Sequence, residues 1–154
     1  FSGGIYPISA VIMNERSSRW MRQDGSDHMS TFGGSELGCI CALKVFEILN
    51  RPSTRENVKF LSGYIRAGLE IIRATYPDFF TGIRQNGLIM GLEFAGESGA
   101  VRVMQSLYQN GVWAIYSMLD NSVLQFKPGL LCTREYCDEL LEKMEKGSPE
   151  TGTV

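Results

Sequence analysis

Two adjacent glycines, Gly33 and Gly34, lead directly into a long apolar segment, residues 37–49. Glycine lets the backbone adopt a positive φ or approach another group closely, so the pair predicts a turn. Ser35 stands where a helix N-cap residue belongs, and the carboxylate of Glu36 suits the dipole of a helix in its first turn. Because almost every residue of the segment is apolar, we expect a helix that is buried on most of its sides.

Two hydroxyl side chains, Ser30 and Thr31, come just before the glycine pair. Hydroxyls and the N–H groups at a helix N-terminus both donate hydrogen bonds to phosphate oxygens. The segment is therefore a candidate anion-binding loop, although a plain turn before a helix has the same spacing. His28, the only histidine in the chain, precedes the hydroxyls, and we assign it a structural role in this loop rather than a proton-transfer role.

Composition narrows the class of protein. The chain of 154 residues has the size of one domain, and its net charge of -2 with no basic run argues against nucleic acid as a partner. We find neither an apolar segment of membrane length nor a secretory signal, so we expect a soluble, cytoplasmic protein with no membrane contact. The cysteines have no zinc or redox spacing, and we expect reduced structural thiols and no metal site. They are Cys39, Cys41, Cys132 and Cys137.

Helical periodicity predicts three further helices. The first runs from Ser53 to Tyr76, opens with a Ser-x-x-Glu capping box and ends before a proline. The second spans Ser98 to Asn110, and the third follows a cap at Thr133 and ends at Gly147. The side chains expected to point inward are Val58, Leu61, Ile65, Leu69 and Ile72 in the first helix, Val101, Met104, Leu107 and Tyr108 in the second, and Tyr136, Leu140, Leu141 and Met144 in the third.

Short apolar or alternating segments predict strands. Ile5 to Met13 is rich in Ile and Val and suits a buried strand. Residues 88–94 alternate, so that every second side chain shares one face. The other predicted strands are residues 81–84, 112–117 and 123–126, with Asp120-Asn121 as the turn before the last of them.

These elements predict an α/β chain with two parts joined by a helix. Residues 1–52 resemble the end of a larger α/β layer, and residues 53–78 form the connecting helix. Residues 79–147 form a small α+β domain. Residues 148–154 are small and polar, and we expect them to be disordered.

Four short motifs follow one another along the chain: Gly3-Gly4-x-Tyr6-Pro7-x-Ser9-Ala10, His28-x-Ser30-Thr31-Phe32-Gly33-Gly34, Gly87-Leu88-x-x-Gly91-x-Glu93 and Phe126-x-Pro128-x-Leu130. In this order they resemble the C-terminal half of a class III aminotransferase. These are pyridoxal-phosphate enzymes of fold type I, such as the ornithine, acetylornithine and 4-aminobutyrate aminotransferases. The resemblance covers nearly the whole chain, and it implies the end of a fold type I large domain followed by a small C-terminal α+β domain.

The resemblance assigns roles to the hydroxyl pair. In that family the threonine of this motif reaches across a dimer interface and binds the cofactor phosphate of the neighbouring subunit. Thr31 takes that role here, with Ser30 beside it. The resemblance thus implies pyridoxal 5'-phosphate as the cofactor and a homodimer with its active site at the subunit interface. The family's usual Asn-Pro after the glycines is replaced by Ser35-Glu36, which should leave the start of the helix intact.

The family's catalytic lysine, which forms a Schiff base with the cofactor, is not in this chain. By resemblance it would fall just before Phe1. Transamination needs this amine both to hold the cofactor and to move a proton. We therefore expect no catalytic residue in these 154 residues, no activity from them alone, and the upstream half of the same enzyme as their partner.

A second departure from the family bears on the substrate. Ornithine-type and acetylornithine-type members have an arginine immediately before the Phe-x-Pro-x-Leu motif that clamps the substrate α-carboxylate, and here that position is Gln125. A neutral amide binds a carboxylate about half as strongly as a charge-assisted pair, or less. We hypothesise that the carboxylate of the amino donor is held elsewhere or is absent, as in an ω-amino acid or a diamine. The alternative is that Gln125 only packs at a strand end. Lys127 is expected at the surface or the rim of the site, with substrate contact as its alternative.

The function implied by the resemblance is amino-group transfer from an amine or amino acid to a 2-oxo acid. An aminomutase or a racemase on the same fold would share every motif, and product analysis separates those reactions. A rival of another class is a non-catalytic α/β module that binds a phosphorylated ligand or a partner protein.

Overall fold

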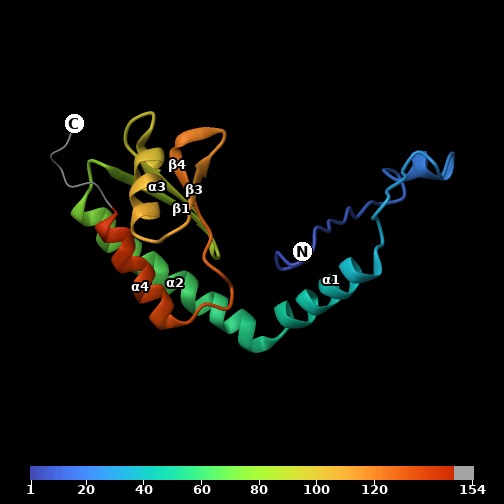
Figure 1. Ribbon diagram of the computed structural model, residues 1–154, viewed down its shortest axis with the longest axis horizontal. Coiled ribbons are helices and arrows are strands. Elements are labelled where there is room, and N and C mark those ends of the chain that lie inside the picture. The colour runs from blue at the N-terminus through green and yellow to red at the C-terminus, as the bar shows by residue number, and fades with distance from the viewer. Residues whose placement is uncertain (148–154) are drawn as a thin grey trace. The chain divides into compact units, whose positions relative to one another are not determined.

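The structure is a computed structural model that describes residues 1–147 (Figure 1). The chain divides into two compact units, Phe1–Pro52 and Ser53–Val154. The tail predicted to be disordered, residues 148–154, lies outside the described residues. The elements in chain order are η1 (Arg19–Arg22), α1 (Glu36–Leu49), α2 (Pro52–Thr75), β1 (Phe80–Asn86), β2 (Ile89–Phe94), α3 (Gly99–Gln109), β3 (Ile115–Ser117), β4 (Asp120–Phe126) and α4 (Arg134–Lys146).

The first unit consists of irregular backbone, the short 3₁₀ helix η1 and the helix α1. The strand predicted from Ile5 to Met13 is wrong, because these residues form no strand and the side chain of Ile12 is 99% exposed. A strand needs a neighbour to pair its N–H and C=O groups. All the strands within residues 1–147 belong to one sheet, formed by residues 80–126, so the first unit offers no neighbour.

Helix α1 begins where the sequence predicts, but the prediction that it is buried on most sides is wrong. Leu37, Ile40 and Leu43 are 60%, 63% and 69% exposed. The buried residues of the helix are Gly38 and Ala42, which are both small. The other helix of this unit, η1, has four residues, none of them buried, so the unit contains too little regular structure to cover an apolar helix all round.

Helix α2 confirms the predicted apolar stripe and carries it into the core of the second unit. Its start differs from the prediction, because the helix begins at Pro52 and Ser53 therefore lies inside its first turn. Proline suits the first helical position, where its φ is already helical and its missing N–H needs no partner. The predicted connecting helix thus belongs to the same unit as the sheet. The stripe residues Leu61, Ile65, Leu69 and Ile72 are buried.

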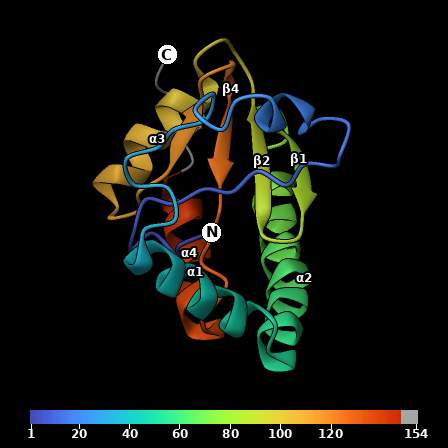
Figure 2. The same cartoon turned by 90° about the vertical axis from the view of Figure 1, so that its right-hand side faces the viewer.

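Four antiparallel strands form a sheet with the order β1-β2-β4-β3. Figure 2 shows β2 between β1 and β4. Met90 lies opposite Phe126, and Leu92 lies opposite Leu124, so these side chains share one face of the sheet. All four are buried, which confirms the alternation predicted for residues 88–94. The core of the unit therefore lies on this face.

The turn predicted at Asp120-Asn121 is wrong. Asp120 already pairs with Ser117, so the turn lies at Met118-Leu119. Two exposed apolar residues at a hairpin tip gave no turn signal, whereas Asp and Asn are favoured turn residues. Strand β3 is also shorter than predicted, with three residues.

Helix α3 confirms part of the predicted inward face, because Leu107 is buried and Met104 packs against the core. Tyr108, expected to point inward, is 65% exposed. At the start of the helix, a Cβ on Gly99 would lie 2.8 Å from the Cβ of Phe94. The helix therefore enters against strand β2 at a position that only glycine can occupy without a shift. Its buried residues are Gly99, Ala100, Val103 and Leu107.

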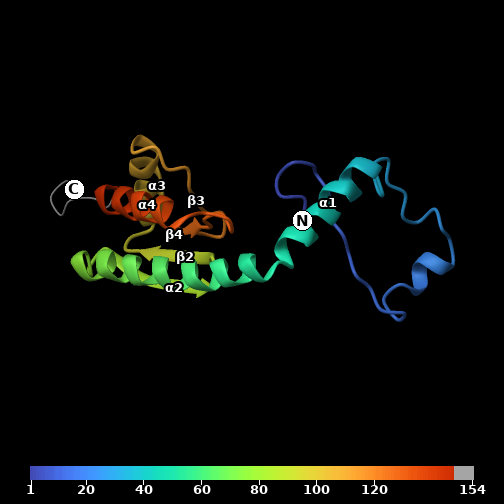
Figure 3. The ribbon, with the colours of Figure 1, turned by 90° about the horizontal axis from the view of Figure 1, so that it is seen from below.

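Helix α4 lies alongside α2 (Figure 3), and a hydrogen bond from the Tyr64 hydroxyl to the Asp138 carboxylate joins them. The predicted cap is confirmed, since Thr133 Oγ1 accepts a hydrogen bond from the N–H of Tyr136 at 3.3 Å. The prediction that the Tyr136 side chain points inward is wrong, because the residue is 51% exposed. The predictions for Leu140 and Met144 are confirmed, since both are buried, and Cys137 is buried beside them, at three- and four-residue steps.

Candidate functional site

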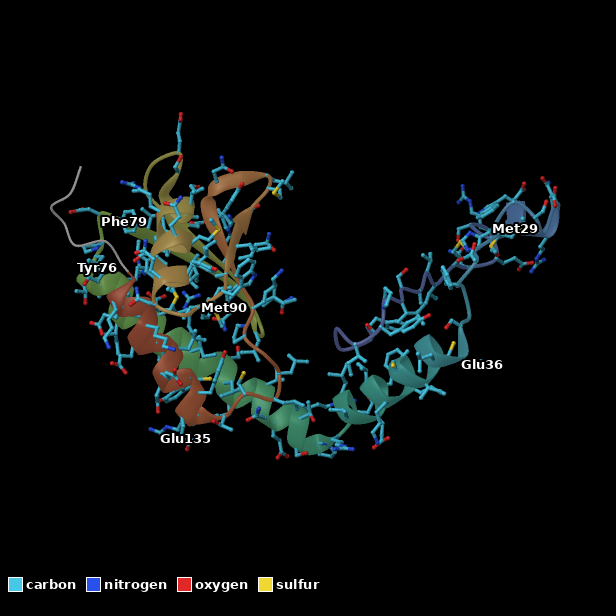
Figure 4. All side chains as sticks on the ribbon, in the orientation of Figure 1. Met29, Glu36, Tyr76, Phe79, Met90 and Glu135 are labelled. Carbon is cyan, nitrogen blue, oxygen red and sulfur yellow. The ribbon has the colours of Figure 1, made fainter. Side chains whose placement is uncertain are left out.

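The predicted anion-binding loop lies in the first unit, between Met29 and Glu36 (Figure 4). Ser30 and Thr31 are both exposed. Within residues 1–147, neither hydroxyl makes a hydrogen bond. Each can therefore donate to an acceptor from outside the unit.

The glycine pair shapes this loop. Gly34 has a φ of +69°, in the left-handed region that side chains disfavour. Gly33 is needed for space, because a Cβ there would lie 2.9 Å from Ser30 Cβ and 3.0 Å from Ser30 Oγ. The N–H of Ser35 donates to the carbonyl of Phe32 at 3.2 Å and closes the turn. The Ser30 side chain thus packs directly against the turn.

The N-terminus of α1 has no side-chain cap. Ser35 occupies the predicted N-cap position, but its hydroxyl makes no bond to the helix backbone. Its Oγ instead lies 3.0 Å from the Tyr6 hydroxyl, and either oxygen can be the donor. The first N–H groups of α1 therefore remain available to an anion, at the positive end of the helix dipole. Sequence reasoning missed the Tyr6 contact, for which the only signal was the place of Tyr6 in the first motif.

His28 contacts an aromatic ring within the same unit. Its imidazole lies edge-on to the indole of Trp20, with ring centroids 6.4 Å apart. This contact gives His28 a packing partner in the segment that leads to the hydroxyl pair.

Gln125, the predicted substrate-binding residue, lies on β4 in the second unit. Its side chain alternates with the buried Leu124 and Phe126 and so belongs to the face opposite the core. Its Nε2 donates to the carbonyl of Tyr116 at 3.3 Å. Gly91 stands directly opposite on β2 and offers no side chain there. Gln125 also lines a cavity of about 360 Å³.

Lys127 follows two positions after Gln125 and lines the same cavity. Its Nζ donates to Gln125 Oε1 at 2.8 Å. Helix α4 contributes Tyr136 and an ion pair to the cavity wall, with Lys143 Nζ 2.6 Å from Glu139 Oε1. The sequence did not predict the contact between Lys127 and Gln125, although residues two apart lie on the same side of a strand.

The predicted site residues fall into different units: Ser30 and Thr31 in the first and Gln125 in the second. All four cysteines are free. In the part of the chain that the structure describes, no group of three or more His, Cys, Asp or Glu could hold a metal ion. Nor does any helix in that part combine the length and apolar character that crossing a bilayer requires.

Comparison with known proteins bears on the whole chain. The family model described as aminotransferase class-III matches residues 1–147. The chain is 39% identical over 143 residues to an uncharacterized aminotransferase of Archaeoglobus fulgidus, covering 93% of this chain and 34% of that protein. It is 28% identical over 151 residues to the acetylornithine aminotransferase of Rhodobacter capsulatus, covering 98% of this chain and 37% of that enzyme. The chain thus spans about a third of the length of the curated relatives it matches.

The fold resembles that of a solved transaminase. The crystal structure of a transaminase from the marine bacterium Virgibacillus matches with a TM-score of 0.80 at 19% identity, over 95% of this chain and 36% of that one. At this identity the likeness establishes the fold alone, which is α/β with a four-stranded sheet. The family resemblance drawn from the four motifs is therefore confirmed, and because the family model matches every described residue, the chain belongs to the class-III aminotransferases.

Proposed function

We propose that this chain is the C-terminal part of a pyridoxal-phosphate-dependent enzyme that transfers an amino group from an amine or amino acid to a 2-oxo acid. One observation carries the proposal: two exposed hydroxyls, on Ser30 and Thr31, precede a glycine turn and an uncapped helix N-terminus. Within residues 1–147 the two hydroxyls have no hydrogen-bond partner, and they and the first N–H groups of α1 can donate to phosphate oxygens.

The residues present fit the phosphate of pyridoxal 5'-phosphate. The Ser30 and Thr31 hydroxyls and the first N–H groups of α1 donate, and phosphate oxygens accept. Glu36 adds a negative charge nearby, so hydrogen bonds rather than net charge supply the affinity. When bound, the cofactor supplies the electron sink that stabilises a carbanion at the carbon bearing the amino group. The residues of this chain hold and orient the cofactor by its charged end.

We assign these hydroxyls to the cofactor of the neighbouring subunit in a homodimer, following the family resemblance. Their exposure supports this assignment, since a contact with a second subunit needs side chains that point away from their own unit. The lysine that bonds the cofactor then belongs to the polypeptide upstream of Phe1. In this proposal residues 1–52 end the large domain, the second unit is the small C-terminal domain, and the 154 residues alone are inactive. A cytoplasmic location suits the four free cysteines, because thiols stay reduced there.

Gln125 bears on the substrate. Because the family's arginine is replaced by a neutral amide, the proposal assigns the amino donor's carboxylate to another group or to none, as in an ω-amino acid or a diamine. The side chain of Gln125 lines a cavity, so a substitution at this position would change the surface that a bound ligand contacts.

The experiment that tests the proposal compares Thr31→Val with Thr31→Ser in the whole protein that contains this chain. Valine keeps the shape and removes the hydroxyl, whereas serine keeps the hydroxyl. Loss of one hydrogen bond to a charged group should weaken cofactor binding by roughly ten- to hundredfold in Thr31→Val. Thr31→Ser should bind within about threefold of the unmodified protein. Cofactor affinity equal in all three proteins would contradict the phosphate role.

A mixed dimer tests whether Thr31 acts across the interface. One subunit carries Thr31→Val and keeps the upstream lysine, and the other keeps Thr31 and lacks that lysine. If the hydroxyl serves the neighbouring subunit, one site of the mixed dimer has both groups, and activity returns. If Thr31 serves its own subunit, neither site is complete, and activity stays low. Product analysis then separates amino transfer, which consumes a 2-oxo acid, from isomerisation, which does not.

A further inference from the structure

The end of strand β4 carries a positive charge that no acidic side chain balances. Lys127 Nζ contacts the neutral amide of Gln125. Among the ion pairs of residues 1–147, none includes Lys127, whereas Lys143 in the same cavity is paired with Glu139 at 2.6 Å. An ammonium has three N–H donors. Gln125 accepts from one, so two remain for a ligand.

Gln125 holds this ammonium in place. Its Oε1 accepts from Lys127 at 2.8 Å while its Nε2 donates to the Tyr116 carbonyl at 3.3 Å. An ammonium only donates and a carbonyl only accepts, so the amide can satisfy both partners in one orientation alone. Tyr116 belongs to β3, which pairs with β4, so the sheet itself fixes the amide. The long lysine side chain is therefore tethered near its charged end.

The cavity beside these residues has room for a small metabolite. Its volume is about 360 Å³, within the range of small-molecule sites. Its wall joins the end of β4 to α4, which contributes the Tyr136 ring and the paired Lys143 and Glu139. Because the Lys143–Glu139 pair is neutral overall, Lys127 gives the cavity a net positive charge.

We infer that the cavity binds a carboxylate of the amino donor or acceptor through Lys127 Nζ, with Gln125 as the residue that positions the ammonium. The identification of the ligand as a substrate rests on the proposed function. Of the possibilities left open by Gln125, the inference selects the one in which the carboxylate is held elsewhere, on Lys127. The substrate class is then an amino acid rather than a diamine.

The test uses the whole protein and two non-reacting probes, glutarate and its uncharged diamide glutaramide, measured by calorimetric titration. Lys127→Gln should weaken glutarate binding by about three- to tenfold at low salt, the range for a partly exposed charge pair. Lys127→Arg keeps the charge, and its affinity for glutarate should stay within about twofold of that of the unmodified protein. Lys59→Gln removes an exposed lysine of α2 and is the matched control, which should bind as the unmodified protein does. Added salt should weaken glutarate binding to the unmodified protein more than glutarate binding to Lys127→Gln.

Kinetics supply the second arm, with 4-aminobutyrate and 1,4-diaminobutane as donors of the same carbon number. Lys127→Gln should raise KM for 4-aminobutyrate and leave that for the diamine unchanged. The inference would be overturned if Lys127→Gln bound glutarate as tightly as the unmodified protein, or if Lys59→Gln lost as much glutarate affinity as Lys127→Gln. In either case, normal transamination would still support the proposed function. Conversely, glutarate binding that depends on Lys127 in a protein without amino transfer would support the carboxylate site and contradict the proposed function.

Discussion

Replacing Gly33 by alanine places a methyl group against Ser30, one of the two residues on which the cofactor proposal depends. The new Cβ would lie 2.9 Å from Ser30 Cβ, whereas carbon atoms in contact prefer about 3.5–4.0 Å. Ser30 must then withdraw by about 0.6 Å or more. A hydroxyl hydrogen bond of about 2.8 Å lengthened by that amount leaves the normal range. The expected result is the loss of one bond to a charged group, or a roughly ten- to hundredfold weaker affinity for pyridoxal 5'-phosphate.

The assay is a cofactor titration of the whole protein, followed by absorbance, for Gly33→Ala and for Gly25→Ala. Gly25 is the matched control because it lies in the same unit and has nothing within 4 Å of its Cβ position. Circular dichroism and the melting temperature show whether either variant has lost structure. If Gly33→Ala keeps its structure and binds the cofactor as tightly as Gly25→Ala, the Ser30 hydroxyl does not contact the phosphate.

Three further predictions concern the second unit. Gly63→Ala should stabilise the protein by about 0.8–1 kcal/mol in urea unfolding, because Gly63 is exposed in α2 and its Cβ position is open. The same exchange at Gly99 should destabilise by about 1–3 kcal/mol, since the methyl group would meet Phe94 side chain and backbone within 2.8–3.0 Å. A hydrogen bond from Arg73 holds the pKa of Glu70 below its usual 4.5, so Glu70 stabilises the fold above that pH and loses this effect as pH falls through its lowered pKa. The melting temperature of Glu70→Gln should therefore fall less steeply below about pH 4.5 than that of the unmodified protein.

The second unit was predictable because its elements bury their own apolar faces against one another. The stripe of α2 and the alternation of β2 are local patterns, and the partners that cover them lie within the same unit. The errors in this unit lie in helix α3 and at the tip of the hairpin between β3 and β4. Gly99 lies against Phe94 at the start of α3, whose Tyr108 is exposed, and the turn at Met118-Leu119 has no turn residue. Neither effect is visible in periodicity, because each depends on a contact between elements.

The first unit was predicted less well for a related reason. An apolar run such as Ile5 to Met13 indicates burial only if something covers it. Within the unit no strand pairs with the run, and its contact with α1, where Tyr6 and Ile8 lie against Gly38, leaves most of it exposed. The glycine turn and the start of α1 were predicted correctly, since both are local features. The bond between Ser35 and Tyr6 joins residues 29 positions apart and could not be read from spacing.

The exchange of the family's arginine for Gln125 and the presence of Lys127 are best understood as one change. Lys127 lies two residues along the chain, which moves the origin of the positive charge by about 6–7 Å on an extended backbone. In the proposed enzyme, a cation that starts from there would meet the carboxylate of a donor with a different distance between amine and carboxylate. Gln125→Arg alone would remove the acceptor that tethers Lys127 and place a like charge beside it. The donor preference should therefore shift toward α-amino acids more fully in the double variant Gln125→Arg with Lys127→Gln than in either single variant, measured as the ratio of kcat/KM for ornithine and 4-aminobutyrate. An unchanged ratio in all three variants would mean that neither residue contacts the substrate.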